Sequence, residues 1–72
     1  MSDDNYRVIY ELVVFNNIQL RTKRFKELEE ATAYYEKIVV MYMGGYGVNL
    51  DIALYDNEDT QIQSLSIKNM EY

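Results

Sequence analysis

The chain contains no cysteine, histidine, proline or tryptophan among its 72 residues. Without cysteine and histidine it can form no disulfide, no thiolate or imidazole metal site, and few of the usual nucleophile–base pairs of enzymes. A chain without disulfides is compatible with a reducing cytosol. Residues 1–5 are acidic and polar, unlike a secretory signal, which starts with positive charge and continues with an apolar stretch. We therefore expect a cytoplasmic protein.

Long apolar runs are also missing. The longest, residues 38–43, is far below the roughly 18 residues that a membrane span requires. A chain of 72 residues has room for a single small core, which rarely supplies more than about 3–5 kcal/mol. We expect one domain over residues 1–72 with flexible ends at 1–5 and 69–72. Because such a small core is often supplemented by a partner subunit, we also expect a homodimer.

Positive charge is scarce, since 12 acidic residues outweigh 7 basic ones and give a net charge of −5. Four of the cations form one basic run: Arg21, Lys23, Arg24 and Lys26. Cations of this kind protect an edge strand against pairing with another sheet, or they dock on an acidic protein surface. Nucleic-acid binding through the run is a weaker hypothesis, because the acidic remainder of the chain repels a polyanion.

Two strands are predicted at the start of the chain. Apolar and polar residues alternate over residues 6–14 and again over 18–23, as expected for strands of a sheet with one buried face. The asparagines between them favour a tight hairpin. A three-residue loop, 15–17, would pair Val14 with Ile18 and keep both strands apolar on the same face. We therefore expect the three-residue loop.

The period changes over residues 25–43, where apolar residues recur three and four positions apart, as on one face of a helix. Acidic residues fill the predicted first turn, where they complement the helix dipole, and Gly44 follows as a left-handed stop. Val40 points away from the predicted core. The predicted core face consists of Leu28, Ala31, Tyr35, Ile38 and Tyr42, with Tyr34 and Val39 flanking it.

A second hairpin is predicted over residues 48–55 and 60–68, joined by the polar turn 56–59. Its centred loop would pair Leu50 with Leu65. The predicted fold is α+β with the order ββαββ, a four-stranded antiparallel sheet carrying one helix on one face. The simplest crossover gives the spatial strand order second, first, third, fourth.

One helix can cover only one face of that sheet, so the other face is expected to carry an apolar patch, which often marks an interface. The chain also has eight tyrosines, a residue type enriched at interfaces. Three of them are hard to place in the core. The candidate protein-interaction residues are therefore Tyr34, Tyr46, Tyr55, Ile9, Val13, Ile62 and Val40, with Ala53 on the same predicted face.

Two segments resemble ligand-binding motifs only superficially. The glycine-rich segment 43–47 follows a predicted helix, whereas phosphate-binding loops precede one and use its positive end. The turn 56–59 has three carboxylates but lacks the ligand spacing of a calcium loop. We expect no cofactor, no metal and no catalytic residues, and hence not an enzyme.

In architecture, the chain resembles the very small acidic proteins encoded by bacteriophages and mobile elements. The resemblance rests on the initial hairpin, the FKELEEA segment at 25–31, the tyrosine pair at 34–35 and the segment GYGV at 45–48. It implies a binder that inhibits or redirects a bacterial nuclease, polymerase or defence complex in the host cytoplasm. The basic run departs from what a simple DNA mimic requires.

The leading hypothesis is thus a non-enzymatic protein-interaction module that forms a homodimer through its open sheet face or the exposed side of its helix. A first alternative is an acidic DNA mimic that uses Glu27, Glu29, Glu30, Glu36 and the turn 56–59. A second alternative is a structural domain whose role is dimerisation.

Overall fold

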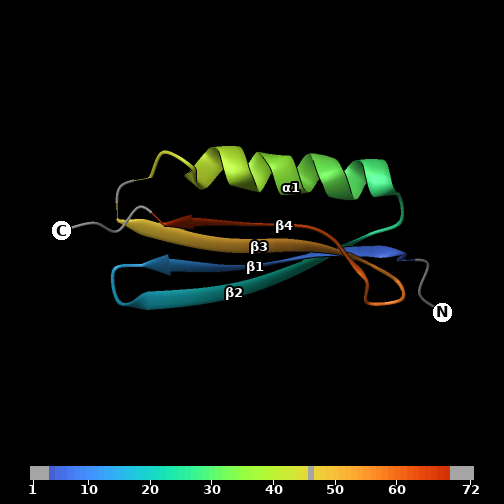
Figure 1. Cartoon of the computed structure of the whole chain (residues 1–72), viewed down its shortest axis with the longest axis horizontal. Coiled ribbons are helices and arrows are strands. Elements are labelled where there is room, and N and C mark those ends of the chain that lie inside the picture. Colours follow the sequence, from blue (N-terminus) through green and yellow to red (C-terminus); the bar gives the residue numbers. More distant parts are fainter. Residues whose placement is uncertain (1–3, 46, 69–72) are drawn as a thin grey trace.

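The computed structural model describes residues 4–45 and 47–68 of the chain. It has the predicted α+β fold, with the order ββαββ and one helix on one face of a four-stranded antiparallel sheet (Figure 1). The strand order β2-β1-β3-β4 is also as predicted. The elements are β1 (Tyr6–Val14), β2 (Asn17–Phe25), α1 (Leu28–Tyr42), β3 (Val48–Asp56) and β4 (Gln61–Lys68).

The core lies between α1 and the two central strands, β1 and β3. Alternate side chains of each strand point toward the helix because successive residues face opposite sides of a sheet. Across the β1–β3 pair, Val8 lies opposite Leu54, and Leu12 lies opposite Leu50. The buried core consists of Val8, Leu12, Ala31, Tyr35, Ile38, Val48, Leu50, Ile52 and Leu54.

The helix begins three residues later than its periodicity predicted. Phe25 is the last residue of β2, and its ring lies 5.2 Å from that of Tyr34. Glu27, in an extended conformation, precedes the first turn, which carries two further glutamates as predicted. Leu28 was placed on the core face but is 43% exposed, whereas Val40 is 67% exposed, as expected.

The predicted stop at Gly44 is wrong. The helix ends at Tyr42. The next residue, Met43, caps it in a right-handed conformation, and the Met43 N–H donates to the Val39 carbonyl at 2.8 Å. The glycine with positive φ is Gly47, at +76°. A Cβ at Gly47 would lie 3.3 Å from the ring of Phe15. Glycine is therefore required where the α1–β3 loop meets the β1–β2 turn.

The predicted three-residue hairpin loop is also wrong. The chain turns in two residues beginning at Phe15, so Val14 pairs with Asn17 instead of Ile18. Phe15 adopts a φ of 56°, an uncommon conformation for an aromatic residue. A one-residue change of register moves every side chain of a strand to the other face. Ile18 and Leu20 consequently point away from the helix.

The helix-facing side of β2 is instead occupied by Gln19, Arg21 and Lys23, opposite Leu12, Tyr10 and Val8 of β1. The prediction assumed that one helix would cover the inner face of this strand. α1 packs mainly against β3 and β1 and less against β2, so long polar side chains can lie along the margin of the core with their charged ends in water. The Lys23 ammonium lies 5.3 Å from the Tyr34 ring centroid, within the range of a cation–π contact.

The β3–β4 hairpin is displaced by two residues from its predicted register. Leu50 pairs with Ile67, and Leu65 pairs with Ile52. Because the displacement is even, the predicted inner face of β4 is kept. Between Leu54 and Tyr55 the register shifts at a β-bulge that begins β4.

The start of β1 is tied to the end of β2. The Asn5 N–H donates to the Phe25 carbonyl at 3.0 Å, and the Asn5 amide donates to the Lys26 carbonyl at 3.3 Å. Ordered contacts therefore begin within the predicted flexible end at 1–5, and residues 1–3 and 69–72 lie outside the described residues. Within 4–45 and 47–68, no helix is long and apolar enough to cross a membrane.

Candidate protein-interaction surface

The side of the sheet that faces away from α1, here called the open face, is covered by no element of the described chain. The alternation of side chains and the pairing registers assign its residues. It comprises Arg7, Ile9, Glu11 and Val13 of β1, Ile18, Leu20, Thr22 and Arg24 of β2, Asn49, Asp51, Ala53 and Tyr55 of β3, and Ser64, Ser66 and Lys68 of β4.

Apolar residues gather on the β2–β1 half of the open face. Val13 lies directly opposite Ile18, and Ile9 lies opposite Ala53 on the next strand. Ile18 and Leu20 are 67% and 65% exposed. These five residues, Ile9, Val13, Ile18, Leu20 and Ala53, form what we call the apolar patch.

Sequence reasoning placed Ile9, Val13 and Ala53 on this face correctly and missed Ile18 and Leu20. The error follows from the hairpin loop, which was assigned one residue too many. General hairpin statistics favour the observed register, because two-residue connections are the commonest. It was outweighed by the assumption that the apolar residues of both strands should share the core face.

Two carboxylates occupy the middle of the open face. Glu11 of β1 and Asp51 of β3 lie directly opposite each other, an arrangement that is unfavourable between like charges. The Ser66 hydroxyl donates a hydrogen bond to Asp51 and offsets part of that repulsion. Both carboxylates line a shallow depression of about 580 Å³ together with Leu20 and Tyr55. The face thus combines apolar surface with a local excess of negative charge.

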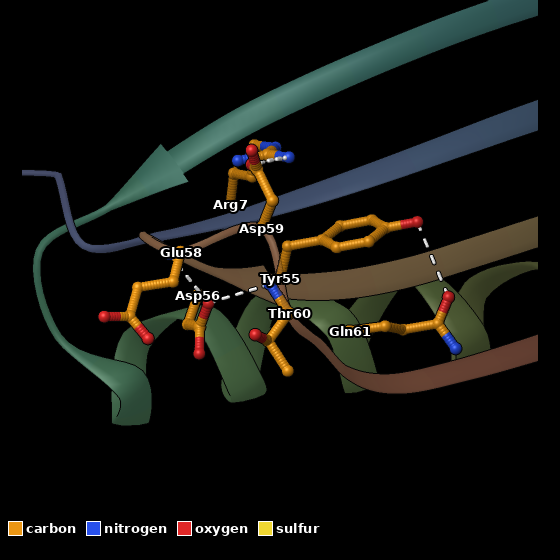
Figure 2. Close-up of polar contacts among 7 residues, drawn as sticks. All are labelled: Arg7, Tyr55, Asp56, Glu58, Asp59, Thr60 and Gln61. Atoms are coloured by element: carbon orange, nitrogen blue, oxygen red, sulfur yellow. Dashed lines mark hydrogen bonds and ion pairs between the residues drawn. The ribbon is translucent and has the colours of Figure 1, made fainter.

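Tyr55 is held at one end of the open face by polar contacts (Figure 2). The Arg7 guanidinium lies 5.0 Å from the Tyr55 ring centroid and 2.6 Å from a carboxylate oxygen of Asp59. The Tyr55 hydroxyl donates to the Gln61 side chain at 3.5 Å. These contacts give Tyr55 a defined position, and they balance the charge of Arg7. Ile62, in the adjacent bulge region, is 45% exposed.

The acidic turn 56–59 forms the predicted hairpin connection. One oxygen of Asp56 accepts hydrogen bonds from the N–H groups of Glu58 and Thr60, both at 2.9 Å (Figure 2). Asp59 adopts a φ of 62° and pairs with Arg7. The carboxylates thus stabilise the turn and its neighbour. In the described ranges, no three acidic, histidine or cysteine residues are grouped to hold a metal ion.

The basic run lies mainly on edge strand β2, as required by the hypothesis that its cations protect a sheet edge. Alternation places Arg21 and Lys23 on the helix side and Arg24 on the open face, while Lys26 follows the strand. The run is therefore divided between two sides of the sheet. A protein or nucleic acid docking on either face would meet only part of its charge.

The remaining candidates have different positions. Tyr34 packs against the core, and the pKa of Tyr10 is raised by burial and by a hydrogen bond with Tyr34. Tyr34 thus has internal contacts that the sequence did not reveal. Tyr46 lies outside the described residues. Val40 lines a groove between α1 and β4 that also includes Leu65.

Comparison with known proteins assigns the chain to no family. No family model matches it, and no curated protein or solved structure matches it. The functional argument therefore rests on the geometry and chemistry of its own residues.

Proposed function

We propose that the chain is a non-enzymatic protein-interaction module that binds its partner through the open face. The apolar patch carries this proposal. Fully burying a leucine or isoleucine side chain contributes about 1.5–3 kcal/mol, yet Ile18 and Leu20 are mostly exposed on a regular strand. A partner that covers them recovers this free energy, in the way that a few apolar anchors dominate many interfaces.

The charges of the open face define the chemistry of the partner. The opposed pair Glu11 and Asp51 favours a lysine or arginine of the partner at the centre of the interface, and the net charge of −5 favours a basic partner surface. Arg24 and the ion-paired Arg7 lie toward one end, where polar rim contacts are expected. The partner should therefore present an apolar surface with an embedded cation.

The resemblance in architecture to small acidic phage and mobile-element proteins supports a host-directed role. In this proposal the partner is a bacterial cytoplasmic protein whose activity is blocked or redirected when the open face covers part of its surface. The chain acts by occupying a site, without performing chemistry.

DNA mimicry is the principal competitor, and the charge arrangement supports it less well. A mimic needs an extended array of acidic groups, but Asp59 in the acidic turn is paired with Arg7, and Asp56 accepts hydrogen bonds from its own turn. Mimicry also predicts that binding weakens steeply as ionic strength rises. Binding that is centred on the apolar patch should depend much less on salt.

The proposal is tested by a pull-down from nuclease-treated bacterial lysate with three baits: the wild-type chain, Leu20→Lys and Met41→Lys. Leu20 lies in the apolar patch, whereas Met41 is an exposed apolar residue of α1, 54% accessible, and serves as the matched control. We expect a stoichiometric partner that survives a high-salt wash, persists with Met41→Lys and is lost with Leu20→Lys.

The captured protein is then purified, and its direct binding to each bait is measured. Retention by Leu20→Lys at wild-type affinity would contradict the open face as the binding surface. Loss of the partner at high salt with every bait would favour mimicry. Capture of no stoichiometric partner would contradict the host-directed role.

A further inference from the structure

The two edges of the sheet differ in how they are protected. Edge strand β2 carries three cations within its length, Arg21, Lys23 and Arg24, which discourage pairing with another strand. Edge strand β4, with the sequence QIQSLSIK, has a single charge, Lys68, at its end, and no proline. Among the described residues no strand pairs with its outer side. Its backbone groups are available to a further strand.

The helix side of β4 is also open. α1 packs against β3, β1 and β2, but it does not pack closely against β4. A groove of about 350 Å³ lies between them. Its apolar lining comes from Tyr35, Val39 and Val40 of α1 and Leu65 of β4, and Glu36, Gln63 and Ser64 also line it. Val40 and Leu65 are 67% and 42% exposed. Any strand that extends the sheet at β4 would therefore meet apolar surface beside the new edge.

Charge selects the orientation of the added strand when that strand is a second β4. Lys68 ends the strand, and the acidic turn 56–59 precedes its start. Antiparallel pairing of two copies brings each Lys68 toward the acidic turn of the other copy, whereas parallel pairing places the two lysines side by side. The β4 edge is thus complementary to itself in the antiparallel orientation.

The side-chain alternation limits the register. If the two-fold axis is perpendicular to the sheet, each residue must pair with one on the same face, so the axis passes through a residue position. Placing it at Leu65 pairs Ile62 with Lys68 of the other copy. The two Leu65 side chains then meet on the helix side, between the two apolar grooves.

We propose that a second copy of this chain docks on the β4 edge, antiparallel and centred on Leu65, and joins two four-stranded sheets into one continuous sheet. Both helices lie on the same side of that sheet, and both open faces lie together on the other. The dimer contact and the partner-binding surface are therefore separate. The inference does not rest on the proposed function.

Sedimentation equilibrium of the purified full chain at about 100 μM tests the proposal, because this concentration lies well above the micromolar dissociation constants of moderately stable dimers. We expect a dimer for the wild-type chain and for Leu20→Lys, and a monomer for Leu65→Lys. Circular dichroism checks that each variant is folded. A monomeric wild-type chain, or any other pattern among the three folded proteins, overturns the proposal.

A cysteine cross-link provides a second measurement that does not depend on a destabilising charge. Because the chain has no cysteine, Leu65→Cys introduces a single thiol in each chain. At the proposed axis the two thiols of the dimer lie next to each other. Mild oxidation should yield a disulfide-linked dimer with Leu65→Cys. The control Gln19→Cys, exposed on edge strand β2, should form no disulfide-linked dimer, because β2 lies outside the proposed contact. Equal cross-linking of both variants, or none with Leu65→Cys, overturns the proposed edge contact.

Discussion

The two faces of the sheet carry similar apolar residues but differ in how far those residues are buried. On the helix side, Leu50 and Leu54 are each 1% exposed, whereas on the open face Leu20 is 65% exposed. Composition does not distinguish these leucines. Their difference is set by register and by the single helix, which has only one side of the sheet to cover. We infer that the first group stabilises the fold and that the second is available for recognition.

The largest expected effect compares the same substitution on the two faces. Leu54→Ala should lower the free energy of unfolding by about 2–5 kcal/mol, because it removes buried contacts and leaves a cavity. Leu20→Ala should change it by no more than about 0.5 kcal/mol, as is usual for exposed positions. Urea denaturation followed by circular dichroism measures both. Similar losses in the two variants would contradict the assignment of the faces.

A smaller loss of stability is expected at Gly47, where the α1–β3 loop meets the β1–β2 turn. Gly47→Ala forces a side chain into a positive-φ position and against the Phe15 ring, and should cost about 1–3 kcal/mol. Gly44→Ala is the matched control, because a Cβ there meets no atom within 4 Å and its φ is not positive. Thermal unfolding of both variants checks the prediction. An equal change in melting temperature would show that Gly47 is not constrained.

The ion pair at the end of the open face should contribute less. Asp59 is 76% exposed, and a surface pair of this kind is typically worth no more than about 1 kcal/mol. Asp59→Asn should therefore destabilise the fold only slightly, and the difference should shrink at high salt. Urea denaturation at low and high ionic strength provides the measurement. A loss that is large or independent of salt would mean that Asp59 has a structural role in the turn beyond the ion pair.

The smallest expected effect concerns the titration of Tyr35, which does not change stability at neutral pH. Burial raises the pKa of Tyr35, on the helix side, above its ordinary value of 10.0. The protonated Tyr35 hydroxyl therefore contributes to folding stability. This contribution is fully present below the unfolded-state pKa and is lost as pH rises through the raised folded-state pKa, because only the unfolded chain readily releases the proton. Stability should fall above about pH 10. It should fall less steeply in Tyr35→Phe, as followed by urea denaturation across pH.

Much of the fold could be predicted because it depends on local periodicity. The alternation in β1 and β3 and the helical spacing of Ala31, Tyr35 and Ile38 identify elements whose buried faces agree with the structure. The hairpin registers could not be predicted. They depend on tertiary facts that the pattern does not contain: a phenylalanine accepting positive φ at position 15, and a bulge at the start of β4.

The candidate surface was predicted in part for the same reason. Ile9 and Val13 follow from the alternation of one strand, but Ile18 and Leu20 depend on how that strand pairs with its neighbour. The packing of Tyr34 could not be predicted, because its contacts with Phe25 and Lys23 join residues on different elements. Spacing along the sequence does not reveal such contacts.

The most direct test of the open face is the affinity of the purified partner for Leu20→Lys and for Met41→Lys, measured by isothermal titration calorimetry. We expect at least a tenfold loss for Leu20→Lys, equivalent to about 1.4 kcal/mol, and no significant loss for Met41→Lys. Equal affinity of the two variants would contradict the assignment of the open face as the surface that binds the partner.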